Sequence, residues 1–157
     1  MLVIEMNDGR TMKFELDSEH APITTANFRK LAEEHFFDGL IFHRIIRGFM
    51  IQGGDPTGTG MGGSKETIKG EFAANGVDNP IRHFRGTISM ARDSRPNSAS
   101  SQFFICHQDA PHLDGSYAAF GNMTEGWEVL DDLASVATDF RDRPLDPPVI
   151  RTIYFED

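Results

Sequence analysis

Residues 42–55 read FHRIIRGFMIQGGD, and this segment decides the fold. Apolar residues alternate with other residues from Phe42 to Ile46, and the apolar pattern resumes at Phe49 after a break at Arg47-Gly48. Alternation with a period of two marks a half-buried β-strand, and glycine favours a turn. We therefore predict two short strands with a turn between them.

Arg44 is the unusual residue of the first strand. It should share a strand face with Phe42 and Ile46, and a guanidinium among apolar side chains costs free energy unless a partner compensates it. By pattern alone, an ion pair with a structural carboxylate is the simplest explanation. The thioether of Met50 and the amide of Gln52 nearby suggest a second explanation, a site of peptide size that includes Arg44.

The rest of the chain predicts short strands and two helices. Asp8-Gly9 separates two alternating runs, which is a strong hairpin signal. A helix should run from Pro22, whose missing N–H costs nothing in a first turn, to about Glu34. A second helix should begin at Thr124, with a buried stripe of Trp127, Leu130, Leu133 and Ala134. Further strands are predicted at residues 2–6, 11–16, 86–91, 102–106, 118–121 and 149–155.

Many short strands without β-α-β alternation favour a mainly β fold, either an antiparallel barrel or a sandwich. Two helices suffice to close the two ends of a barrel. Residues 55–85 form a long irregular segment, and such loops in a compact domain are usually functional. Neither an internal repeat nor a linker is evident, so we expect residues 1–157 to form a single domain.

The composition narrows the class of partner. The net charge is −9, from 24 acidic and 15 basic residues, which opposes a nucleic-acid partner. No apolar run approaches the roughly 20 residues that a membrane crossing needs. The first five residues are too short and too soon charged for a secretory signal. Cys106 is the single cysteine, which fits a reducing compartment, so we expect a cytoplasmic protein.

Three blocks, in order along the chain, resemble the signature of the cyclophilin-type peptidyl-prolyl cis-trans isomerases. They are residues 42–55, residues 101–105 (SQFFI), and residues 112–115 (HLDG) together with Phe120-Gly121. The resemblance covers essentially the whole chain and is greatest to small single-domain bacterial members. It implies a closed eight-stranded antiparallel β-barrel capped by two α-helices, isomerase activity on Xaa–Pro bonds, and no cofactor or metal.

The resemblance also implies roles for particular residues. It matches Arg44 to the catalytic arginine, Gln52 to the amide that holds the substrate backbone, and Phe49 to the catalytic pocket. The remaining walls of the proline pocket are Met50, Phe104 and Leu113. The other positions expected to bind peptide are Gly60, Ala91, Arg92, Gln102, His112 and Tyr117.

Two positions depart from the members most sensitive to cyclosporin. His112 occupies a tryptophan position, and Tyr117 occupies a histidine position. We therefore expect weak cyclosporin binding. The resemblance implies that the main partners are proline-containing peptides and unfolded or partly folded proteins. We expect the protein to be a monomer. Arg92 stands where the better-known eukaryotic members carry asparagine, and the loop 92–97 is one residue longer than theirs.

An arginine suits the implied reaction. Rotation about a peptide bond has a barrier near 18–20 kcal/mol because the amide is conjugated. Twisting the Xaa–Pro amide returns a lone pair to the prolyl nitrogen, so a catalyst needs a fixed donor aimed at that atom. A guanidinium offers five N–H donors and stays charged, but it cannot act as a base.

Other function classes fit less well. A binding module for proline-containing segments without catalysis is the main alternative. Residues 58–63 match the letters G-x-G-x-x-G, but Pro56 precedes them and no helix can open from them, as the dinucleotide fingerprint requires. His and Cys residues lack zinc-ligand spacing. Cys106-His107 is a poor catalytic dyad because adjacent strand residues point to opposite faces, so a hydrolase is not expected.

Overall fold

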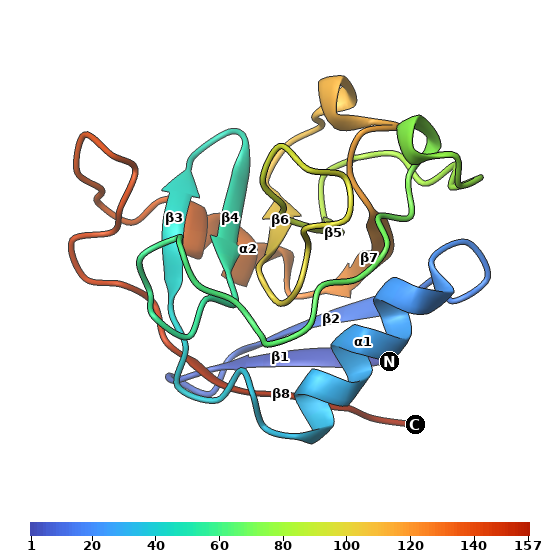
Figure 1. Ribbon diagram of the computed structural model, residues 1–157. Coiled ribbons are helices and arrows are strands. Elements are labelled where there is room, and N and C mark those ends of the chain that lie inside the picture. Colours follow the sequence, from blue (N-terminus) through green and yellow to red (C-terminus); the bar gives the residue numbers. More distant parts are fainter.

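The computed structural model describes all residues from 1 to 157. Eight strands form one sheet in the order β3-β4-β6-β5-β7-β2-β1-β8, and every neighbouring pair is antiparallel (Figure 1). The strands are β1 (Leu2–Met6), β2 (Thr11–Leu16), β3 (Phe42–Ile46), β4 (Met50–Gly53), β5 (Thr87–Met90), β6 (Phe103–Cys106), β7 (Ala119–Glu125) and β8 (Ile150–Phe155). The predicted mainly β, antiparallel architecture is confirmed.

The prediction of a closed barrel is wrong. The edge strands β3 and β8 share no ladder and are joined only by an isolated bridge between Ile41 and Val149. The residues before this bridge are Pro147-Pro148, which have no N–H to extend a ladder beside β3. The N–H of Ile45 on β3 instead donates to the carbonyl of Asp142, 2.9 Å away in the preceding loop. The sheet is therefore a curled, open half-barrel.

Two α-helices flank the half-barrel (Figure 1). Helix α1 (Pro22–Glu33) packs against β8, and α2 (Trp127–Ala134) contacts β2, β3 and β4. Helix α2 begins three residues later than predicted because Thr124 and Glu125 continue β7. Gly126, with φ of 97°, then turns the chain into the helix, in a conformation that favours glycine. Neither helix has the length and apolar character needed to cross a membrane.

The predicted burial of Trp127 is also wrong. Its side chain is 37% exposed, and the guanidinium of Arg85 lies 5.4 Å from its ring centroid. The buried stripe of α2 consists of Val129, Leu130, Leu133 and Ala134. Trp127 is the first residue of the helix, where its side chain overhangs the turn at Gly86 rather than the core.

Phenylalanines build the centre of the core. The ring of Phe28 on α1 stacks on Phe37 at 4.7 Å and meets Phe103 edge-on at 5.2 Å. Each fully buried Phe contributes roughly 1.5–3 kcal/mol of hydrophobic stabilisation. A second, smaller apolar cluster lies apart from this core, and it contains Met50, Phe104, Cys106, Ala110 and Leu113. Three members of this smaller cluster reach the surface pocket described below.

Glu71 holds the start of α1 from far along the chain. Ala21 precedes the helix and supplies no side-chain cap. The buried carboxylate of Glu71 instead accepts hydrogen bonds from the N–H of Thr24 at 2.6 Å, the Thr24 hydroxyl at 2.7 Å and the N–H of Ile23 at 3.2 Å. Free N–H groups and the helix dipole both favour an anion there. Part of the irregular segment 55–85 is thus structural.

Candidate active site

Strand register brings the central residues of the site together. Arg44 on β3 pairs with Gln52 on β4, and Gln52 pairs with Phe104 on β6. Directly paired residues of an antiparallel sheet project on the same face with their Cβ atoms about 5 Å apart. A guanidinium, an amide and a phenyl ring therefore form a row across three strands, although Phe104 is distant in sequence.

These residues belong to one small pocket with a volume of about 130 Å³. Such a volume suits a single small ring and not a drug-sized ligand. Met50, Phe104 and Leu113 form buried apolar walls, and Phe49 is half-buried at the edge. The complete lining is Arg44, Phe49, Met50, Gln52, Ala91, Arg92, Phe104, Leu113 and Tyr117. All nine residues were expected at the site.

A register shift between Phe42 and Arg44 decides where the arginine points. Phe42 is fully buried in the core, whereas Arg44 is exposed at the pocket, so the expectation that they share a strand face is wrong. No carboxylate lies within ion-pair distance of Arg44. Its Nη1 is instead 3.4 Å from Oε1 of Gln52. The ion-pair explanation of Arg44 is therefore contradicted.

A second hollow, of about 410 Å³, adjoins the pocket and shares Gln52, Ala91 and Arg92 with it. Gly60 and Gln102 line this more polar hollow. The guanidinium of Arg92 is held in place: it donates to the Ser116 carbonyl at 2.6 Å and lies 4.7 Å from the ring centroid of Tyr117. Of the expected site residues, only His112 lines neither hollow. Its ring lies against that of Phe49 at the pocket edge, with centroids 5.5 Å apart.

Asp55 shapes the glycine-rich rim of the second hollow, a role that the sequence pattern does not reveal. Its carboxylate is 1% exposed and accepts hydrogen bonds from the N–H groups of Thr57, Gly60 and Gly62 at 2.7–3.0 Å, and from the Thr57 hydroxyl. Burial opposes its ionisation, but these hydrogen bonds prevail and lower its pKa to about 2. A Cβ at Gly62 would collide with this carboxylate.

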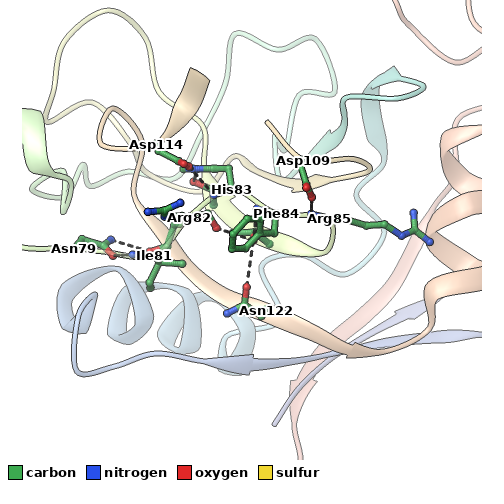
Figure 2. Close-up of polar contacts among 12 residues, drawn as sticks. Asn79, Ile81, Arg82, His83, Phe84, Arg85, Asp109, Asp114 and Asn122 are labelled. Carbon is green, nitrogen blue, oxygen red and sulfur yellow. Dashed lines mark hydrogen bonds and ion pairs between the residues drawn. The ribbon is translucent and has the colours of Figure 1, made fainter. Parts of the chain in front are cut away.

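A buried histidine supports the floor of the pocket. The ring of His83 stacks on that of Phe104 with centroids 5.8 Å apart. Its Nδ1 is 3.0 Å from Oδ1 of Asp114 (Figure 2), which follows Leu113 of the pocket wall. Its Nε2 is 2.9 Å from Oγ of Ser89. Burial lowers the pKa of His83 although Asp114 opposes this. The Ser-His-Asp order resembles a hydrolase triad, but Ser89 is fully buried and no substrate can reach it.

One group of side chains in the structure has the composition of a cation site. Asp17, Glu19 and His20 place their ligand atoms within 4.8 Å of one another. The group is solvent-facing, and His20 is already engaged by Asp17 at 2.9 Å. None of its members lines the pocket or the hollow beside it, so the site geometry assigns the group no part in the chemistry.

Comparisons with known proteins agree with this geometry. Residues 1–154 match the family model for cyclophilin type peptidyl-prolyl cis-trans isomerase/CLD. The chain is 47% identical over 130 residues to peptidyl-prolyl cis-trans isomerase B of Bacillus subtilis, covering 83% of this chain and 87% of that protein. It is 48% identical over 132 residues to a peptidyl-prolyl cis-trans isomerase of Helicobacter pylori, covering 83% of this chain and 77% of that protein.

A solved structure is similar over nearly the whole fold. The cyclophilin type isomerase of Cryptosporidium parvum, crystallised in the presence of the dipeptide Ala-Pro, superposes with a TM-score of 0.90 at 36% identity, covering 99% of this chain and 98% of that chain. The fold, the pocket and these matches define a peptidyl-prolyl cis-trans isomerase. The chain belongs to the cyclophilin family of these enzymes, and it isomerises Xaa–Pro bonds rather than only binding them.

Proposed function

We propose that Arg44 donates to the prolyl nitrogen of the twisted Xaa–Pro amide, while Gln52 holds the substrate backbone and the apolar walls seat the prolyl ring. One observation carries this proposal: a guanidinium without a carboxylate partner stands at a small apolar pocket. A permanently charged donor that cannot take a proton matches a reaction in which no bond is broken. Phe49, Met50, Phe104 and Leu113 supply the slot for the ring.

The energetic demand on the site is modest. An acceleration of about 10⁵-fold needs only about 7 kcal/mol of transition-state stabilisation. A charge-assisted hydrogen bond in a partly dry site contributes a few kcal/mol, and selective binding of the twisted amide supplies the remainder. Gln52 directs one Nε2–H toward Gln102 and keeps its second for a peptide carbonyl. Gly60, Ala91, Arg92, Gln102, His112 and Tyr117 would contact the flanking peptide.

The decisive experiment compares the parent with Arg44→Ala and Arg44→Lys in an assay of prolyl isomerisation. We expect Arg44→Ala to lower kcat/KM by about 10²–10³-fold, as loss of a transition-state donor does in other enzymes. Lysine keeps the charge without the planar fork and should recover only part of the rate. Arg47→Ala removes an exposed arginine from the same hairpin and serves as the control, with a rate near that of the parent. A fully active Arg44→Ala enzyme would overturn the role of Arg44.

We further propose that residues 1–157 act as one domain and as a monomer in the cytoplasm, on proline-containing segments of unfolded or partly folded proteins. The single cysteine, Cys106, is a free thiol, which is usual in a reducing compartment. It is fully buried and burial raises the pKa of its thiol to about 12, so it is not a reactive nucleophile. Size-exclusion chromatography with light scattering tests the monomer, and fractionation of cells tests the compartment.

A further inference from the structure

His107 joins the pocket hairpin to helix α2. It follows β6 and is 7% exposed. Its Nδ1 accepts a hydrogen bond from the N–H of Gly48 at 2.8 Å, and its backbone N–H donates to the carbonyl of Phe49 at 2.8 Å. Its Nε2 lies 3.0 Å from Oδ1 of Asp131 on α2. One side chain and its backbone therefore hold both residues that end the β3–β4 turn.

These contacts define the protonation state of the imidazole. The N–H of Gly48 can only donate, so Nδ1 of His107 must keep its lone pair, and the single ring proton lies on Nε2 and points to Asp131. Arg85 donates to Asp131 at 2.8 and 3.1 Å and to the His107 carbonyl at 3.0 Å. Hydrogen bonds from Arg85 first, and from His107 second, lower the pKa of Asp131 and keep it charged.

Apart from the Phe49 ring, which packs against His112 and the smaller apolar cluster, the turn has few other attachments. Gly48 adopts φ of 81°, and a Cβ placed on it would meet nothing within 4 Å, so no neighbouring side chain packs there. The N–H of Phe49 closes the turn on the Ile46 carbonyl at 2.9 Å. Segments with few packing contacts open most easily, so the two bonds to His107 carry much of the order of the turn.

We propose that His107 is a positioning residue of the isomerase, which in its neutral form holds the β3–β4 turn so that Phe49 stays at the pocket. It acts through Gly48 and Phe49 and does not touch the substrate. The inference rests on the proposed function, because it requires the pocket beside Phe49 to be the catalytic site.

Two substitutions separate the two contacts of the ring. Asparagine places its amide near the position of Nδ1 and can still accept from Gly48, whereas glutamine reaches the position of Nε2 and keeps only the contact to Asp131. We expect His107→Asn to keep kcat/KM within about twofold of the parent. His107→Gln should lower it by about three- to tenfold, as the loss of one hydrogen bond does.

Amide NMR supplies a readout besides activity. The Gly48 amide proton should shift upfield in His107→Gln but not in His107→Asn, and thermal unfolding shows whether each variant is folded. Equal activity and equal Gly48 shifts in the two variants would overturn the inference. An Arg44→Ala enzyme with parental activity would instead overturn the assignment of the site, whatever the His107 series shows, so the two failures are distinguishable.

Discussion

Nε2 of Gln52 donates a hydrogen bond to Oε1 of Gln102 at 2.8 Å, across 50 residues of sequence. Nε2 of Gln102 in turn donates to the carbonyls of Gly60 at 3.0 Å and Gly62 at 2.7 Å. These partners fix both amide orientations, so Oε1 of Gln52 faces Arg44. A chain of donors runs from Arg44 to the glycine-rich rim, and successive bonds of such a chain polarise one another.

Replacing Gln102 by leucine tests this chain. Gln102→Leu keeps the volume of the side chain but leaves two glycine carbonyls and one N–H of Gln52 without their partner. We expect kcat/KM to fall by about three- to tenfold, because one ordered hydrogen bond contributes about 1 kcal/mol and the rim also loosens. Gln108→Leu is the matched control at an exposed position. A parental rate in Gln102→Leu would show that the chain does not matter for turnover.

The hydrogen bonds to Asp55 should make the folded protein less stable in strong acid. The pKa of its carboxyl is lowered in the folded state, so its contribution is present above the ordinary carboxyl range and is lost as the pH falls toward about 2. Asp55→Asn should lower the free energy of unfolding at pH 7 by roughly 2 kcal/mol and flatten the dependence of stability on pH between 4 and 2. Urea unfolding at several pH values measures both effects. Asp146→Asn, at an exposed position, should change neither.

Replacing Glu71 should lower the stability of the fold without changing the catalytic rate. Glu71→Ala leaves two N–H groups and the hydroxyl of Thr24 without a partner in a buried place, which should cost about 1–3 kcal/mol of unfolding free energy. The folded fraction should isomerise at the parental rate, because Glu71 lines neither hollow. Glu34→Ala alters an exposed carboxylate at the other end of α1 and is the control. An unchanged midpoint of denaturation in Glu71→Ala would contradict the capping role.

Cyclosporin should bind weakly. His112 lies against Phe49 at the pocket edge, where the sensitive relatives are expected to carry a tryptophan. A tryptophan offers more apolar area and an indole N–H, so His112→Trp should tighten binding by about tenfold or more. Fluorescence or calorimetric titration of both proteins measures this. Nanomolar binding by the parent would contradict the prediction.

Local sequence patterns predicted most elements and failed where distant segments intervened. Strands β1 and β2 have the predicted ends, and α1 ends one residue early. The start of α2 was misplaced because pairing with β2 extends β7 through Glu125, and pairing is not visible in the local pattern. The half-barrel stays open because Pro147-Pro148 cannot extend a ladder. The strand face on which Arg44 lies depends on the register shift between Phe42 and Arg44, which the local pattern does not reveal.

The sequence by itself determined the class of fold and the identity of the pocket residues, because period-two alternation specifies strands and the ordered blocks specify the family. Only the tertiary structure decided what holds those residues in place. Asp55, Glu71, His83 and His107 have no repeating pattern. Asp55 binds N–H groups of the loop that follows it, whereas Glu71, His83 and His107 have partners that lie far away in the chain. A buried polar group is defined by the donors that surround it, and those donors meet only when the chain is folded.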